Sequence, residues 1–337
     1  MAKPSIIKQF GRVAQGERLQ RILQSKHFVN EKFRNEKKTV LSTDKGGMFR
    51  VMGRFLFGAK PKNRIPKAGE ISVIKTDLNL LPTKGDLYIW FGHSSFMLRL
   101  DGKIILADPV FYKGSPVSFV NQPFPGTDVY KPDDMPAKID FLLISHDHWD
   151  HLDCQTVVEL KGRIGKVVCP LGVGEDFECW GFDKSQLIEL DWDESVTSDG
   201  LTFHCLPTRH FTGRGLWNPK TMPASWLMES PSRKVFFSGD GGYDNRFRRI
   251  GKRFPDIDLA IMENGQYNEN WSQIHTMPDA LGREVAELGA KRFVTVHHSK
   301  FCLSMHPWDE PRRNEKKAVA DYDLNLLVCQ IGEVIRL

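Results

Sequence analysis

Several signatures of familiar protein classes are absent from this sequence of 337 residues. No apolar stretch approaches the ~18 residues that a membrane-spanning helix needs, and residues 1–34 contain no apolar run of signal-peptide length. The six cysteines form no CxxC pair and no dense disulfide spacing; they are Cys154, Cys169, Cys179, Cys205, Cys302 and Cys329. Scattered cysteines of this kind are typical of reduced packing residues. We therefore expect a cytoplasmic protein that neither spans a membrane nor is secreted.

Composition and charge are close to those of an average globular protein. The sequence is 40% hydrophobic and 26% charged, which permits a sizeable buried core. The formal net charge of +5 is spread over short clusters, such as residues 60–64 and 246–253. Such a modest positive excess suits an anionic small-molecule substrate and gives no reason to expect a nucleic-acid partner. The oligomeric state is left open.

The texture of the chain changes at about residue 85. Residues 1–85 are basic, rich in helix formers up to Phe33 and then loop-like through residues 60–66. We predict an N-terminal extension (1–85) packed on a catalytic domain (86–337). Within the extension, residues 48–57 interleave apolar and basic side chains. This pattern could describe a segment lying on a membrane surface, but a short helix packed on its own domain is the preferred interpretation.

From Asp86 onward, short apolar runs separated by turn residues predict strands. Residues 87–91, 95–100 and 103–106 predict an antiparallel meander. Helical spacing of apolar residues predicts helices over 155–160 and 278–288. Strands and helices alternate in two successive halves, which indicates sheets covered by helices. Further strands are expected at residues 141–144, 167–169, 201–206, 225–228, 235–238, 259–262 and 293–296.

The densest group of polar side chains directly follows the apolar strand expected at 141–144. Residues 146–153, His-Asp-His-Trp-Asp-His-Leu-Asp, hold three histidines and three aspartates. In an extended stretch His146 and His148 point the same way and could bind one metal, and Asp150 and His151 could serve a second. Imidazole and carboxylate are ligands for Zn²⁺, with Fe and Mn also compatible. The run predicts a metal site, because a surface loop with chance histidines does not account for this density.

Three more candidate ligands each lie just beyond an expected strand. His210 follows strand 201–206, Asp240 follows 235–238, and His297 follows 293–296. Strand ends that converge on one edge can assemble ligands distant in sequence. Glycines flank Asp240 and permit a close approach of the backbone to a metal. His298 is the alternative to His297, and the register of the strand favours His297.

Taken together, these residues resemble the metallo-β-lactamase superfamily. The resemblance lies in the HxHxDH run, a later histidine, an aspartate after a strand and a final histidine. It implies an α/β fold, a four-layer αββα sandwich. From about residue 88 to 297 the sequence is similar to the branch of N-acyl-phosphatidylethanolamine-hydrolysing phospholipases D. The similar segments are residues 90–93, 107–109, 143–153, 188–192, 238–243 and 250–254.

The resemblance implies two Zn²⁺ ions per chain, with Fe or Mn as alternatives. It places His146, His148 and His210 on one ion and Asp150, His151 and His297 on the other, with Asp240 bridging them. Asp150 is expected to orient the nucleophile and take its proton. His275 matches a histidine near the metals in that branch, so we assign it to the substrate or leaving group, with a purely structural role as the alternative. His93 and Asp108 are expected to orient ligands.

The leading hypothesis is a hydrolase in which a hydroxide held by two zinc ions attacks a phosphodiester, as in a phospholipase D acting on N-acyl-phosphatidylethanolamine or a related compound. A lactonase or other carboxylic-ester hydrolase is the first alternative, and a noncatalytic metal-binding or partner-binding protein is the second. Residues 263–266, Glu-Asn-Gly-Gln, depart from the apolar residues of the lipase branch. Arg209 and Arg214, which flank His210, are candidates for binding phosphate. Large apolar residues near the ligands predict either an acyl-chain pocket or part of the core; they are Phe211, Leu216, Trp217, Met222, Trp226, Tyr267, Trp271, Met277, Met305 and Trp308.

Overall fold

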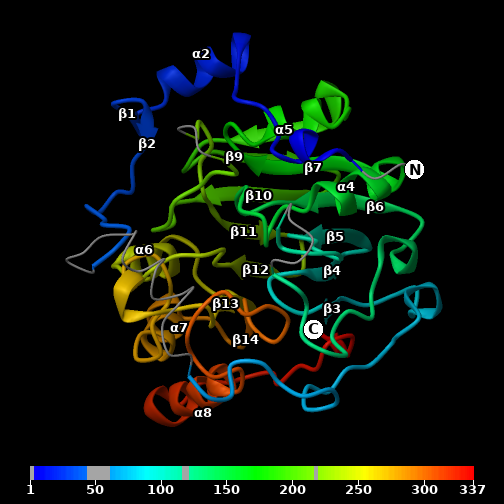
Figure 1. Cartoon of the computed structure of the whole chain (residues 1–337), viewed down its shortest axis with the longest axis vertical. Coiled ribbons are helices and arrows are strands. Elements are labelled where there is room, and N and C mark those ends of the chain that lie inside the picture. The colour runs from blue at the N-terminus through cyan, green and yellow to red at the C-terminus, as the bar shows by residue number, and fades with distance from the viewer. Residues whose placement is uncertain (1–3, 44–60, 116–120, 216–218) are drawn as a thin grey trace.

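The computed structural model describes residues 4–43, 61–115, 121–215 and 219–337. At its centre two mixed β-sheets pack face to face (Figure 1). The seven-stranded sheet has the order β15 (Val334–Arg336), β3 (Leu87–Trp90), β4 (Phe96–Leu100), β5 (Lys103–Ala107), β6 (Ile139–Leu143), β7 (Ile164–Pro170) and β8 (Leu187–Leu190). The six-stranded sheet has the order β14 (Phe293–Val296), β13 (Leu259–Glu263), β12 (Lys234–Phe237), β11 (Ser225–Glu229), β10 (Leu201–Leu206) and β9 (Ser195–Ser198).

Both sheets are built in the same way. In each, an antiparallel meander leads into parallel strands, which begin where β5 pairs with β6 in the first sheet and where β12 pairs with β13 in the second. Strands such as β3 (Leu-Tyr-Ile-Trp) and β13 (Leu-Ala-Ile-Met-Glu) are fully buried and almost wholly apolar, as expected where both faces of a sheet are covered. Phe96 on β4 meets Phe237 on β12, with ring centroids 5.0 Å apart, so the main core lies between the sheets.

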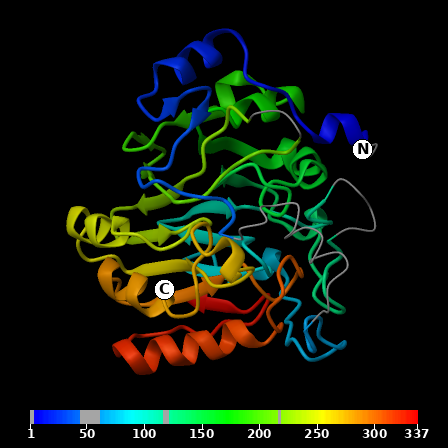
Figure 2. The same ribbon diagram turned by 60° about the vertical axis from the view of Figure 1, so that its left-hand side comes forward.

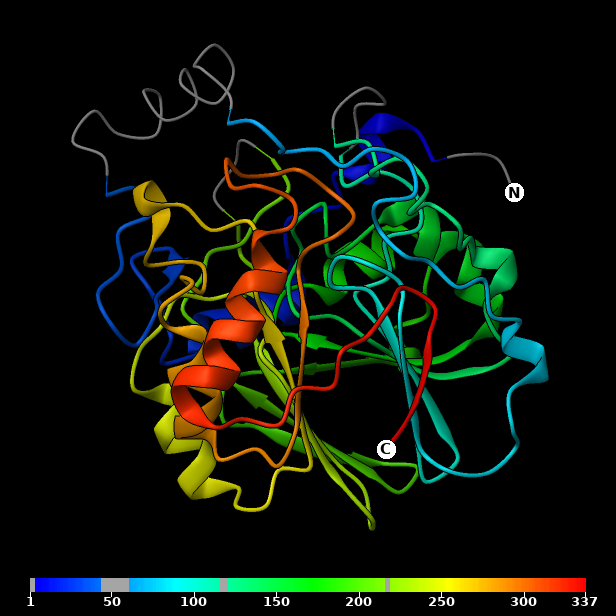
Figure 3. The same cartoon turned by 90° about the horizontal axis from the view of Figure 1, so that it is seen from below.

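Helices cover the outer face of each sheet. On the seven-stranded sheet lie α4 (Cys154–Leu160) and α5 (Gly174–Cys179), and on the six-stranded sheet lie α6 (Arg246–Arg253), α7 (Leu281–Leu288) and α8 (Glu310–Tyr322) (Figure 3). A second apolar cluster joins Phe236 and Met262 of the six-stranded sheet to Phe247 on α6 and Val285 on α7. The layers are therefore helix, sheet, sheet and helix, and the predicted αββα sandwich is confirmed.

The N-terminal residues lie across one end of the sandwich, beside α5 (Figure 2). They form α1 (Ile6–Gln9), α2 (Gly16–Gln24) and a hairpin of β1 (Phe28–Val29) and β2 (Lys32–Phe33). The nearly buried guanidinium of Arg18 forms ion pairs with Glu175, Glu178 and Glu189. Further along, Ile74 donates a backbone hydrogen bond of 2.8 Å to Ile331. The extension is thus held to the sandwich at both ends, while the domain boundary at residue 85 stays a prediction.

Short 3-10 helices occupy several connections. They are η1 (Leu78–Leu80), η2 (Pro132–Asp134), η3 (Lys161–Arg163), η4 (Lys184–Gln186) and η5 (Glu269–Trp271). No helix among the residues described is long and apolar enough to cross a membrane. Residues 48–57, for which the sequence allows a membrane-surface helix, lie outside the described residues.

Candidate metal centre

The candidate ligands of the sequence meet at one edge of the sandwich, where loops leave the carboxyl ends of several strands. His146 and His148 follow β6, His210 follows β10, Asp240 follows β12 and His297 follows β14. His146, His151, His210, Asp240 and His297 are buried, which removes most of the water that would otherwise solvate them. Their nitrogen and oxygen atoms approach closely enough to share a metal ion.

Three imidazoles face one another on one side of this group. The Nδ1 atom of His148 lies 2.9 Å from Nε2 of His146 and 3.2 Å from Nε2 of His210. Burial lowers the pKa of all three rings, those of His146 and His210 well below the usual range, so the neutral form with a free lone pair is favoured. The Nε2 atom of His148 has no hydrogen-bond partner among the described residues. Neutral imidazoles that converge in this way have the chemistry of a metal-binding trio.

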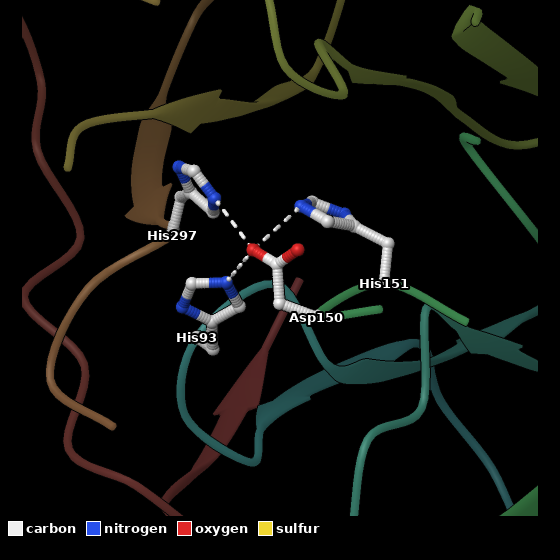
Figure 4. Close-up of side chains that lie close together, drawn as sticks. All are labelled: His93, Asp150, His151 and His297. Atoms are coloured by element: carbon white, nitrogen blue, oxygen red, sulfur yellow. Dashed lines mark hydrogen bonds and ion pairs between the residues drawn. The ribbon is translucent and has the colours of Figure 1, made fainter. Parts of the chain in front are cut away.

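A second group surrounds the carboxylate of Asp150 (Figure 4). Its Oδ2 atom lies 2.8 Å from Nε2 of His93, 3.3 Å from Nε2 of His297 and 3.6 Å from Nε2 of His151. The side chain of Asp150 is 14% exposed and reaches the cavity described below. Asp150, His151 and His297 therefore lie together, and His93 is within hydrogen-bonding distance of Asp150, which it can orient.

Asp240 lies between the two groups. Its Oδ2 atom is 3.2 Å from Nε2 of His151 and 3.2 Å from Nε2 of His297, and also 4.0 Å from Nε2 of His146 and 3.9 Å from Nε2 of His210. The second oxygen, Oδ1, is buried and has no hydrogen-bond partner among the described residues. One carboxylate in contact with both groups is positioned as the sequence expects of a bridging ligand.

The protonation states fit a divalent cation. Burial works against ionisation of Asp150 and Asp240, but the charge on His151 and the other surrounding imidazoles holds the pKa of each carboxyl well below its usual range. Burial likewise disfavours imidazolium, yet the carboxylates of Asp240 and Asp150 hold the pKa of His151 well above its ordinary value and raise that of His297 to about 10. Two buried, ionised carboxylates are stable only if positive charge lies close to them. Metal ions can supply that charge in place of the protons on His151 and His297.

The Nδ1 atoms of His151 and His210 are held by the protein. Nδ1 of His151 lies 2.8 Å from Oδ2 of Asp108, and Asp108 also accepts a 2.8 Å hydrogen bond from the backbone N–H of Ser145. Nδ1 of His210 lies 2.7 Å from the carbonyl oxygen of Ile274, so it carries the proton and leaves Nε2 free. Such partners fix the tautomer and direction of a metal-binding ring. Asp108 is placed to act as predicted from the sequence.

The backbone at the centre is unusual. His93, Asp108 and His297 have φ values of 52°, 39° and 69°, in the left-handed region that residues with a side chain rarely adopt. Such conformations cost about 1–3 kcal/mol each and recur at functional sites. Gly239 has a φ of 54°, and a Cβ atom there would lie 2.6 Å from the carbonyl oxygen of Ala224. This contact shows that Gly239 is needed for close packing of the protein, while the predicted approach of the backbone to a metal stays a prediction.

His297 and His298 occupy separate environments. His297 belongs to the cluster described above, whereas Nε2 of His298 lies 2.9 Å from Oγ1 of Thr295 and its ring packs against Trp90 at a centroid distance of 4.8 Å. His298 is therefore directed into the fold, and the geometry agrees with the choice of His297 made from strand register.

His275 also lies at the centre, and it is held by a residue that the sequence does not single out as part of the site. Its Nδ1 atom bonds to Oε1 of Glu263 and lies 3.9 Å from Oδ2 of Asp240. Glu263 ends β13 and is 1% exposed. A signal was present, because Glu263 follows an apolar strand just as Asp240 and His297 do, but an acidic residue at one strand end is a weak pattern by itself.

A cavity of about 220 Å³ opens over the cluster. Its polar floor includes His148, Asp150, Asp240 and His275, and its apolar wall consists of Phe211, Trp271, Ile274 and Leu303. Two of the apolar candidates from the sequence, Phe211 and Trp271, line this cavity. Met222 and Trp226 instead belong to the main core, and Leu216 and Trp217 lie outside the described residues.

Arg209 and Arg214 do not face the cavity as phosphate-binding groups. Arg214 is 4% exposed and donates to the carbonyl oxygens of Gln9, Asp147 and Leu152. Arg209 is 7% exposed and donates to Thr39, Tyr243 and Gln273. Since the protein already uses these N–H groups, the prediction that the two arginines receive phosphate is wrong.

A buried set of imidazoles and carboxylates at the strand ends of an αββα sandwich defines the metal-dependent hydrolase class. The family model described as "Beta-lactamase superfamily domain" matches residues 103–298. The chain belongs to this superfamily.

Among curated relatives, an uncharacterized protein of Mycobacterium tuberculosis is 40% identical over 227 residues, which cover 66% of this chain and 61% of that protein. This chain therefore matches about three fifths of that relative's length. The N-acyl-phosphatidylethanolamine-hydrolyzing phospholipase D 1 of Caenorhabditis elegans is 28% identical over 268 residues, 73% of this chain and 74% of the relative.

Solved structures share the fold at low sequence identity. Igni18, a metallo hydrolase from Ignicoccus hospitalis, superposes with a TM-score of 0.57 and 19% identity, covering 75% of this chain and 99% of that one. CmlA, a diiron β-hydroxylase from Streptomyces venezuelae, gives a TM-score of 0.58 and 19% identity over 76% of this chain and 55% of that one. These likenesses establish the αββα fold.

Proposed function

We propose that this protein is a metal-dependent phosphodiesterase of phospholipase D type, acting on N-acyl-phosphatidylethanolamine or a related phosphodiester. The observation that carries the proposal is the position of Asp240, in contact with both histidine groups beneath a cavity with one apolar wall. His146, His148 and His210 would hold one ion, Asp150, His151 and His297 the other, and Asp240 both. Two divalent ions, when bound, supply Lewis acidity and lower the pKa of water.

The charge of the site supports an anionic substrate. Among the proposed ligands only Asp150 and Asp240 carry negative charge, which would offset two of the four positive charges that two divalent ions bring. A net positive charge therefore remains at the floor of the cavity, where it attracts a phosphodiester and stabilises charge that gathers on the attacked phosphorus. The wall of Phe211, Trp271, Ile274 and Leu303 suits the apolar part of such a substrate. The activity named for the Caenorhabditis elegans relative is of this kind.

Two side chains that line the cavity have separate roles in this proposal. The carboxylate of Asp150 is oriented by His93 at 2.8 Å and would hold the proton of the attacking water. The imidazole of His275, held at Nδ1 by Glu263, would contact the leaving group.

A phospholipid substrate would bring the protein to a membrane surface. We therefore also propose that this is a cytoplasmic protein that makes peripheral contact with anionic membranes.

Metal analysis and a substrate screen test the proposal. Purified protein should hold about two equivalents of metal per chain, with zinc, iron and manganese measured separately because the ligand set accepts all three. It should release product from N-acyl-phosphatidylethanolamine micelles and from aryl phosphodiesters. Asp150→Asn should reduce this activity by roughly 100-fold or more. His204→Gln is the matched control, because His204 lies outside the centre and pairs with Glu229. Full activity of Asp150→Asn would reject the role of Asp150, whereas no turnover of any of these substrates by the metal-bound protein would favour a noncatalytic metal-binding protein.

Hydrolysis of a lactone or another carboxylic ester is the second candidate. It is considered because Gln266, in the segment 263–266 where the resemblance to the lipase branch is lost, lines the cavity. The two candidates separate when lactones, aryl esters and phosphodiesters are compared on one preparation. Turnover of lactones with no turnover of phosphodiesters would replace the leading proposal with this one.

A further inference from the structure

Glu263 connects several loops of the centre. Its Oε2 atom accepts hydrogen bonds from the backbone N–H of Gly241 at 2.8 Å and of Thr276 at 3.2 Å. Its Oε1 atom bonds to Nδ1 of His275 and lies 3.3 Å from Nδ1 of His297. One buried carboxylate therefore contacts the loops that follow β12 and β14 as well as the loop that carries His275.

The donors around Glu263 determine which nitrogen of His275 faces the cavity. Backbone N–H groups use Oε2, so Oε1 is left to accept the Nδ1–H of His275. The other ring nitrogen, Nε2, has no hydrogen-bond partner among the described residues, and the ring lines the cavity. The ring of His275 also stacks on that of His297, with centroids 5.4 Å apart and planes 12° from parallel. The imidazole is thus held on two sides, and its Nε2 edge is available to a substrate.

We propose that Glu263 is a positioning residue for the hydrolytic reaction, which acts by fixing the direction and tautomer of His275. Its carboxylate keeps the proton on Nδ1 and presents Nε2 to the bound substrate. The kinetic part of this inference rests on the proposed function. Its structural part, the tautomer of His275, can be measured whether or not a substrate is known.

Glu263 could instead act on the metals through His297, because its Oε1 atom is near both rings. The two possibilities give different results in Glu263→Gln. The amide oxygen of glutamine can still accept from Gly241 and Thr276, while its NH₂ group would donate a hydrogen bond to Nδ1 of His275 and so favour the tautomer with the proton on Nε2. If Glu263 acts through His275, metal content stays at that of the unmodified protein and the tautomer changes. If it acts through His297, metal is lost.

Kinetics of single and double variants provide the first arm of the test. Glu263→Gln should lower kcat by about 10–100-fold, as expected for a group that orients a functional histidine, with a smaller effect on KM. In the background of His275→Gln, the same substitution should cost less than about 3-fold, since both changes remove one interaction. Glu175→Gln is the matched control for neutralising a buried carboxylate, because Glu175 is 2% exposed and pairs with Arg12 and Arg18. Full additivity of Glu263→Gln and His275→Gln would overturn the proposal.

Nuclear magnetic resonance of ¹⁵N-histidine in the zinc-bound protein at alkaline pH provides the second arm. His275, assigned by comparison with His275→Gln, should be the Nδ1–H tautomer in the unmodified protein and the Nε2–H tautomer in Glu263→Gln. An Nε2–H tautomer in the unmodified protein would overturn the proposal. This result does not depend on the folding of Glu263→Gln. If the expected tautomers are seen but no phosphodiester, ester or lactone is cleaved, the proposed function fails while the positioning of His275 by Glu263 stands.

Discussion

His151 and Asp108 form a fully buried pair in which Nδ1 of the imidazole lies 2.8 Å from Oδ2 of the carboxylate. The carboxylate directs the opposite nitrogen, Nε2, toward Asp240 at 3.2 Å. We predict that Asp108→Asn lowers metal affinity by about 10–100-fold, because the amide no longer supplies the charge that keeps the ring oriented and basic. Competition with a coloured chelator measures this affinity. Asp199→Asn, at an exposed turn, should leave it unchanged. Equal affinities in the two variants would show that Asp108 does not orient a ligand.

Arg214 stabilises the loop that carries the histidine run. Its Nη1 atom donates to the carbonyl oxygens of Asp147 and Leu152 at 2.9 and 2.6 Å, and its guanidinium lies 3.9 Å from the ring centroid of Trp149. Arg214→Met keeps much of the apolar contact but leaves buried carbonyl groups without donors, at a cost of about 1–3 kcal/mol each. We expect a free energy of unfolding lower by about 3 kcal/mol and weaker metal binding. Urea denaturation of metal-free protein tests the first effect separately from the second. Unchanged metal binding would mean that the loop keeps its shape without this residue.

Arg18 joins the N-terminal residues to the sandwich. Its side chain is 8% exposed and lies 2.6 Å from both Glu175 and Glu189. Removing one member of a buried ion-pair group leaves charges uncompensated, which typically costs about 3–5 kcal/mol. Arg18→Met should lower the free energy of unfolding by roughly that amount. Arg21→Met should cost less than about 1 kcal/mol, because the Arg21–Glu194 pair is largely solvated. Similar losses in both variants would argue against a special role for the buried cluster.

Lys300 gives a prediction about pH. It is fully buried, donates a 2.8 Å hydrogen bond to the carbonyl oxygen of Val110, and burial lowers its pKa from 10.5 to about 8. Between these two values the unfolded chain binds more protons at this position than the folded protein does. The contribution of Lys300 to stability therefore increases as pH rises from about 8 to 10.5 and is lowest below pH 8.

Lys300→Met should remove this pH dependence. We expect the free energy of unfolding of the unmodified protein, relative to Lys300→Met, to rise as the pH is raised from 8 toward 10.5. Parallel denaturation curves at several pH values measure the difference, in which the contributions of other titrating groups cancel. A difference that stays constant over this interval would show that the ammonium group is not destabilised by burial. Lys234→Met is a suitable control variant for Lys300→Met, since Lys234 is only partly buried.

Much of the centre was predictable because its ligands obey a simple rule of chain placement. His210, Asp240 and His297 each follow a strand rich in buried apolar residues. Strands of this kind are the easiest elements to predict from a sequence. The choice between His297 and His298 followed from the same register. Glu263 was missed although it obeys the rule, because a lone carboxylate at a strand end is common in solvated loops and only its contact with His275 reveals its role.

Other parts could not be predicted because their signals depend on tertiary contacts. The helix α8 was not predicted, since its buried face includes Asn314 and Glu315 in place of an apolar stripe. The strands β8, β9 and β15 were also missed, because they lie at sheet edges and are partly exposed, so their sequences contain no buried apolar run. Arg214 lies close to His210 in sequence, which suggested a contact with phosphate. In the structure Arg214 is buried, and its N–H groups donate to backbone carbonyl groups. The closeness of a residue to a ligand in sequence does not show whether its side chain is buried.

At His93, Asp108 and His297, which have left-handed backbone conformations, the residue that favours thermal stability differs from the residue that the site needs. Glycine would relax each of these conformations, so selection of variants for heat resistance alone should enrich glycine at these three positions. The survivors would keep the sandwich and lose the side chains that surround Asp150 and His151. Positions at which thermal selection and catalytic selection favour opposite residues would therefore mark the centre of this protein in an unbiased mutational scan.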